Sequence, residues 1–254
     1  MMSLNEVKLS SVRFKDIVLK QYLYKLKGHS GWIHSLILIQ LISLLFSMSP
    51  MGGMSSGGDS FHININTYTG DAFLVLTMIW MAVMTSFLGS QAYRSIDFSL
   101  VSNRITSYVS NAALILTFAV YAGITGTLMS LLQRMVLVKS LGESEFIFGG
   151  VQMAPWDILL SIFVATLYLL LLASVTYLIQ MVSALNKAAG IALGVFILAF
   201  GFGWIRIFEF KVENVLLFYT AESSLGLFAL KVIGSVVLLL GLSMLISGRM
   251  EVKR

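Results

Sequence analysis

The chain has 254 residues, of which 57% are apolar and 11% charged, and its mean hydropathy is +0.89. Soluble domains carry about 25% charged residues, so this composition excludes a water-soluble enzyme built around one core. The formal net charge of +5 comes from 17 basic and 12 acidic side chains, whose placement follows the membrane and not a nucleic-acid surface. The chain has no cysteine, which excludes disulfides, thiolate metal sites and cysteine nucleophiles.

Apolar windows predict the membrane spans. A helix that crosses about 30 Å of hydrocarbon needs roughly 20 mostly apolar residues. We predict an all-α integral membrane protein with six transmembrane helices, in one domain made of a leader (1–31), a six-span bundle (32–247) and a tail (248–254). The glycine-rich run Gly52–Gly58 is expected to be a flexible loop. The six windows are Trp32–Met48, Asp71–Ser90, Ala112–Gln133, Asp157–Ile179, Ala188–Phe208 and Leu227–Ser247.

The distribution of Lys and Arg predicts the orientation. Twelve basic residues lie in the leader, the second and fourth connections and the tail, whereas the other connections carry four. Because basic residues near span ends prefer the cytoplasm, both termini are predicted to be cytoplasmic, in a plasma-membrane protein. A cleavable signal peptide is not expected, because the charged leader of 31 residues is too long for one.

The leader has the pattern of an amphipathic helix. A helix of this kind lies in the cytoplasmic interface, with its apolar half toward lipid. Lys25 falls on the apolar half and is expected to extend toward the headgroups. The helix is either a topology-setting anchor or an elbow against which a cytoplasmic partner pushes. The elbow residues are Phe14, Val18 and Tyr22 on the apolar half and Lys20 and Lys27 on the basic half.

The second connection, residues 91–111, mixes exposed apolar and charged side chains and lacks Gly and Pro. A helical loop with apolar residues on the cytoplasmic side is typical of a docking surface. A short helix lying on lipid is an equally good interpretation of the composition. The residues that would carry docking are Arg94, Asp97, Phe98, Leu100 and Arg104.

The fifth connection, residues 206–226, alternates charged and bulky apolar side chains. Its apolar run is too short to span, which favours a re-entrant or interfacial segment on the outer side. Local ion pairing with Arg206, Lys211 and Lys231 is one interpretation of its glutamates, and gating of a cargo pathway is the other. The candidate outer-gate residues are Glu209, Glu213, Phe218, Tyr219 and Glu222.

Motifs for chemistry are missing. The sequence has no phosphate-binding Gly-x-x-x-x-Gly-Lys-[Ser/Thr] loop, no His-Glu-x-x-His and no Gly-x-Ser-x-Gly. We therefore predict a non-catalytic chain that binds no metal or cofactor itself. The spans hold few ionisable groups, which disfavours an ion-coupled carrier.

The mild polar groups of the spans, such as Gln40, Ser43, Thr77, Thr85 and Thr125, are expected to form mostly helix–helix hydrogen bonds. The Gly-x-x-x-Gly motif formed by Gly190 and Gly194 predicts close helix packing, with an oligomer interface as the alternative.

Together these features resemble the permease subunit of bacterial type-2 ABC exporters, which have the type V exporter fold. The resemblance rests on an amphipathic N-terminal helix, six spans with both termini inside, a helical loop after span two and an apolar outer segment before span six. It covers the whole chain, although Leu100–Arg104 lacks the proline that many members carry at the start of span three.

The resemblance implies that Arg94–Ser107 is a coupling helix in a cleft of a separate cytoplasmic ABC ATPase, which would bind the ATP and Mg. It implies that Val12–Lys27 is the elbow helix and that Val212–Ser224 caps the pathway outside. Two permeases, identical or different, would pair over two ATPases within membrane lipids and export an amphipathic peptide, lipid or drug. Alternatives are a six-span capture subunit of an ATP-driven importer and an integral lipid-modifying enzyme.

Overall fold

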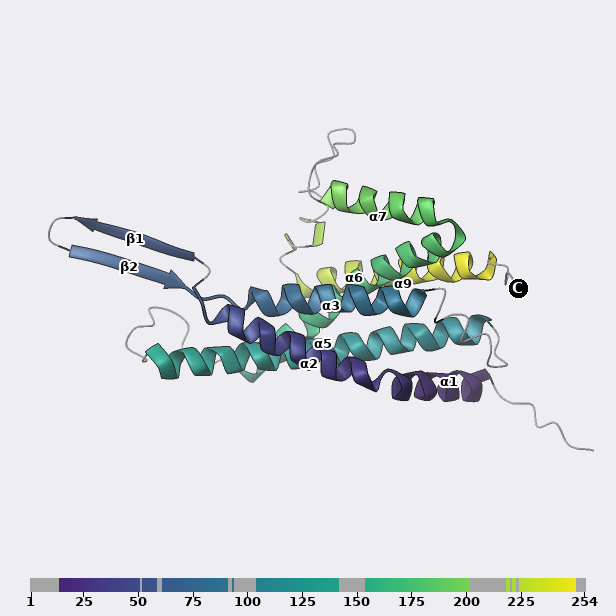
Figure 1. Ribbon diagram of the computed structural model, residues 1–254, viewed down its shortest axis with the longest axis horizontal. Coiled ribbons are helices and arrows are strands. Elements are labelled where there is room, and N and C mark those ends of the chain that lie inside the picture. Colours follow the sequence, from purple (N-terminus) through teal and green to yellow (C-terminus); the bar gives the residue numbers. More distant parts are fainter. Residues whose placement is uncertain are drawn as a thin grey trace, which may run out of the picture.

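The computed structural model describes residues 14–50, 52–58, 61–90, 93, 104–141, 154–201, 218–219, 221–222 and 224–249. Helices run side by side along the long axis, and a two-stranded hairpin extends beyond one end (Figure 1). In chain order the elements are α1 (Phe14–Gly28), α2 (Ser30–Ser47), β1 (Gly52–Gly58), β2 (Phe61–Thr67), α3 (Asp71–Gly89), α5 (Arg104–Leu141), α6 (Pro155–Leu185), α7 (Lys187–Gly201) and α9 (Leu225–Arg249).

Five of the described helices are long and apolar enough to cross a membrane: Ser30–Ser47, Asp71–Gly89, Ile105–Ser140, Pro155–Leu185 and Leu225–Ser247. These helices coincide with five of the six predicted spans. The other predicted span is helical over α7, which has 15 residues, and residues 202–208 lie outside the described part. A helix of that length covers about 22 Å, less than the hydrocarbon thickness. A sixth span therefore stays a prediction.

The helix α5 is much longer than its predicted span. It has 38 residues, or about 57 Å at about 1.5 Å per residue, and so extends past a bilayer core of about 30 Å. Side-chain contacts join Lys25 to Ser110, Gln40 to Thr125 and Gln133 to Ser47, at sequence separations of 85, 85 and 86 residues. This constant separation means that α1 and α2 run parallel to α5, one after the other.

The position of α1 follows from that register. It lies beside the first turns of α5, toward the N-terminal end of the predicted span Ala112–Gln133, and it runs along α5 and not across the end of the bundle (Figure 1). A helix lying flat in the interface is therefore not confirmed.

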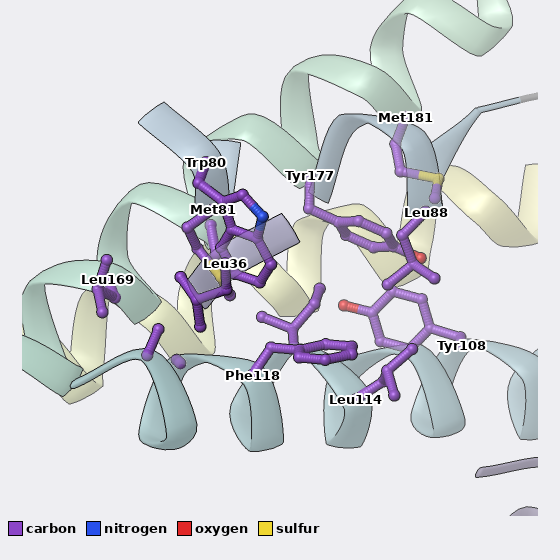
Figure 2. Close-up of a cluster of buried hydrophobic side chains, with 14 residues drawn as sticks. Leu36, Trp80, Met81, Leu88, Tyr108, Leu114, Phe118, Leu169, Tyr177 and Met181 are labelled. Atoms are coloured by element: carbon purple, nitrogen blue, oxygen red, sulfur yellow. The ribbon is translucent and has the colours of Figure 1, made fainter. Parts of the chain in front are cut away.

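The core is built where α2, α3, α5 and α6 meet. Aromatic and aliphatic side chains from all four helices interlock there, with Tyr177 facing Tyr108 and Trp80 near Phe118 (Figure 2). A smaller cluster of Leu167, Phe228 and Val232 joins α6 to α9. Since lipid is as apolar as these side chains, close packing supplies much of the helix association.

The described part of the chain is all-helical apart from this hairpin, which corrects the prediction of a flexible glycine loop. β1 pairs with β2 in antiparallel register, from Gly52 opposite Thr67 to Gly58 opposite Phe61. The signal lay in β2, whose sequence Phe-His-Ile-Asn-Ile-Asn-Thr alternates apolar and polar residues and is rich in β-formers. The glycines of β1, taken without β2, indicate a flexible loop.

The hydroxyls of the spans also behave differently from the prediction. Most of them donate to the carbonyl four residues earlier in their own helix, as do Ser43, Thr85 and Thr176. Hydrogen bonds that do cross between helices include Gln40 with Thr125, Tyr22 with Thr117 and Trp80 with Ser35. A hydrogen bond to a carbonyl of its own helix satisfies the hydroxyl group, so these residues need no partner on a second helix.

The glycine step of α7 confirms the prediction of close helix packing. A Cβ at Gly190 would fall inside the side chain of Ser183 on α6, whereas a Cβ at Gly194 would lie 3.8 Å from Ile179 Cγ2. The turn at Asn186 folds α7 back on the end of α6, and only glycine fits at position 190.

Candidate functional site

A buried lysine joins α1 to α5. The residues that pack toward the bundle recur at helical spacing on α1, and Lys25 is one of them, with 5% of its surface exposed. Its Nζ donates to Asn111 Oδ1 at 2.6 Å and to Ser110 Oγ at 3.0 Å, and it also reaches Ser107 Oγ at 3.2 Å. The expectation that Lys25 extends toward the headgroups is wrong, because oxygens of α5 surround its ammonium.

Asn111 extends this contact to a third helix. Its Nδ2 donates to Tyr177 Oη on α6 at 3.3 Å, while its Oδ1 accepts from Lys25. One turn earlier on α5, Tyr108 packs 5.9 Å from the Tyr177 ring and donates to the carbonyl of Leu240 on α9. We call Lys25, Ser107, Ser110, Asn111 and Tyr177 the polar junction. It links α1, α5 and α6, and Tyr108 adds α9.

An aromatic cluster lies at the turn between α1 and α2. His29 packs edge-on against Trp32 at 4.1 Å between centroids and lies 5.3 Å from the ring of Tyr93. Trp32 also contacts Phe118 of α5, at 5.6 Å. Tyr93 follows α3 and precedes the predicted docking residues, so this cluster ties the start of the second connection to α1 and α2.

The predicted elbow residues divide into two sets. Val18 and Tyr22 are half-buried toward the bundle, and Tyr22 Oη lies 2.9 Å from Thr117 Oγ1. Phe14 is half-exposed, and Lys20 and Lys27 are exposed. The amphipathic pattern is therefore real, but α5 covers part of the apolar half.

The predicted coupling residues lie almost entirely outside the described part of the chain. Arg94, Asp97, Phe98 and Leu100 are not described, and Arg104 is described only as the first residue of α5. Their flanks are described: Tyr93 on one side, and the start of α5 with the polar junction on the other. The structure therefore leaves the docking role itself as a prediction.

The outer-gate residues that are described meet at the start of α9. Glu222 pairs with Lys231, as the sequence predicts, and Lys231 Nζ lies 4.1 Å from the Phe218 ring centroid. Tyr219 Oη shares a hydrogen bond of 2.8 Å with Ser235. Glu209 and Glu213 lie outside the described residues. In Figure 1, α1 lies toward the C-terminal end of α9, and the start of α9 is further from it along the long axis.

The polar junction was not predicted from the sequence, although the sequence carries a signal for it. Ser107, Ser110 and Asn111 recur at helical spacing just before the predicted span, on the stripe that faces α1. Within the described residues no cluster of three or more His, Asp or Glu side chains could hold a metal. Comparison of the chain with family models, curated proteins and solved structures gave no match.

Proposed function

We propose that this chain is the membrane permease subunit of an exporter driven by a separate ABC ATPase, and that it moves an amphipathic cargo outward. The observation that carries the proposal is the polar junction. It joins α1, the proposed elbow, to the start of α5, whose first turn is the last part of the proposed coupling helix Arg94–Ser107.

The junction gives a route for mechanical coupling. A push on the coupling segment would reach α5 at its first turn, and the contacts of Lys25 and Asn111 would carry it to α1 and α6. Long apolar helices and an absence of nucleotide-binding motifs fit a chain whose energy comes from a partner. The helix α1, the end of α3, the start of α5 and the end of α9 lie at the same end of the bundle (Figure 1), which fits cytoplasmic docking.

The test is affinity purification of the tagged full chain from its native membrane. We expect a soluble ATPase with a Walker motif to co-purify, and charge reversal at Arg94 and Arg104 to reduce its yield. Reversal at Lys139, an exposed residue at the other end of α5, is the matched control and leaves the yield unchanged. Purification without any ATPase, together with ion-driven transport by the isolated chain in liposomes, would contradict the proposal.

A further inference from the structure

A cavity of about 320 Å³ opens between α3, α5 and α6, away from the polar junction. Small residues make the space: Gly123 and Gly126 of α5 and Ala165 of α6 line it. At Gly123 a Cβ would collide with Thr166 Oγ1 at 2.5 Å, so α5 and α6 approach closely there. The volume is at the lower end of the range for small-molecule sites and fits a single head group.

The lining of the cavity combines charged residues near the surface with mostly apolar residues that are buried. The charged residues are Asp71, the first residue of α3, and Arg134 of α5. Neither side chain forms an ion pair with another described residue. The buried residues include Ala122 and Leu169. A positive and a negative side chain beside an apolar surface suit an amphiphile whose head group carries both charges.

Thr77 supplies an independent sign of a ligand. It lines the cavity, is 2% exposed, and its Oγ1 has no hydrogen-bond partner among the described residues. Most of the hydroxyls around it are satisfied within their own helix, as Thr127 is by Gly123 and Ser161 by Asp157. A buried hydroxyl without a partner is costly, so a ligand atom would satisfy it.

We propose that this cavity binds the head group of a zwitterionic phospholipid. Arg134 holds the phosphate with its planar guanidinium, Asp71 faces the ammonium group, and Thr77 bonds to an ester or glycerol oxygen. Thr77 lies six residues after Asp71, or about 9 Å deeper along α3, which suits groups further along the lipid. The site lies on this chain alone, so it does not depend on the proposed transport function.

The test is native mass spectrometry of the full chain, extracted from nanodiscs of equal phosphatidylethanolamine and phosphatidylglycerol. We expect phosphatidylethanolamine to be retained preferentially. Arg134→Gln, Asp71→Asn and Thr77→Val should each lower that retention by about tenfold, the effect of about 1.4 kcal/mol. Lys139→Gln and Asp157→Asn remove exposed charges that do not line the cavity, and they should leave retention unchanged.

Several results would overturn the proposal. One is equal retention of the two lipids by the wild-type chain. Another is a loss of phosphatidylethanolamine retention in the control variants that equals the loss in the cavity variants. Displacement of the lipid by free glycerophosphoethanolamine at the same concentration would point to a soluble zwitterion and not to a lipid. Binding of a cationic amphipathic peptide that requires Asp71, without retention of phosphatidylethanolamine, would assign the cavity to a peptide.

Discussion

Lys25 of α1 donates a hydrogen bond of 2.6 Å to the side-chain oxygen of Asn111 on α5, a residue 86 positions further along the chain. A charged group becomes buried between helices only where oxygens replace its water. The contact therefore fixes α1 against α5 at one register. It also makes α1 part of the helix bundle.

Lys25→Met should destabilise the protein by about 1–3 kcal/mol, because it leaves Asn111 and the serines of α5 without their buried donor. Thermal unfolding in detergent measures the change. Lys27→Met removes an exposed lysine from the same turn and should have little effect. If both variants unfold at the same temperature, the contact of Lys25 does not hold α1 in place.

The helical periodicity of the sequence placed Lys25 on the inner side of α1 but did not identify what covers that side. A stripe of this kind fits lipid or a neighbouring helix equally well, and only the tertiary fold shows that α5 covers it. The length of α5 escaped prediction for a related reason. Residues 104–111 are too polar to count as a span, yet they stay helical because α1 packs on them.

Five spans could be predicted because apolar length alone determines them. The Glu222–Lys231 pair was also predicted, because the two residues are near in sequence and oppositely charged. Contacts such as Asn111 with Tyr177 depend on which helices are neighbours, and hydropathy does not contain that information.

Gly190→Ala should cost about 1–3 kcal/mol, because the added methyl group overlaps Ser183 and forces α7 away from α6. Gly194→Ala is the matched variant. Its Cβ makes an ordinary contact with Ile179, and the gain in helix propensity is up to about 1 kcal/mol, so stability should be unchanged or higher. Unfolding temperatures of the two variants provide the comparison. Equal loss in both would contradict the packing described here.

Glu222→Gln should lower stability by about 1 kcal/mol or less, because the Glu222–Lys231 pair is partly exposed to solvent. High salt should shrink the difference between the variant and the wild type. Chemical denaturation at low and high salt measures both effects. A loss that is large and independent of salt would mean that the pair is more deeply buried than described.

The absence of cysteine allows a direct test of orientation. Ser56→Cys places a thiol at an exposed position of the hairpin, and Lys27→Cys places one at an exposed position of α1. In intact cells a membrane-impermeant maleimide should label position 56 and not position 27, and permeabilised cells should label both. Labelling of position 27 from outside would reverse the proposed topology.

Native mass spectrometry of the assembly, extracted from its own membrane in mild detergent, shows whether the chain works as the permease of an ATP-driven exporter. We expect a mass equal to two permease chains, identical or different, plus two ATPase subunits. A mass made of this chain alone, in every detergent that keeps it folded, would contradict it.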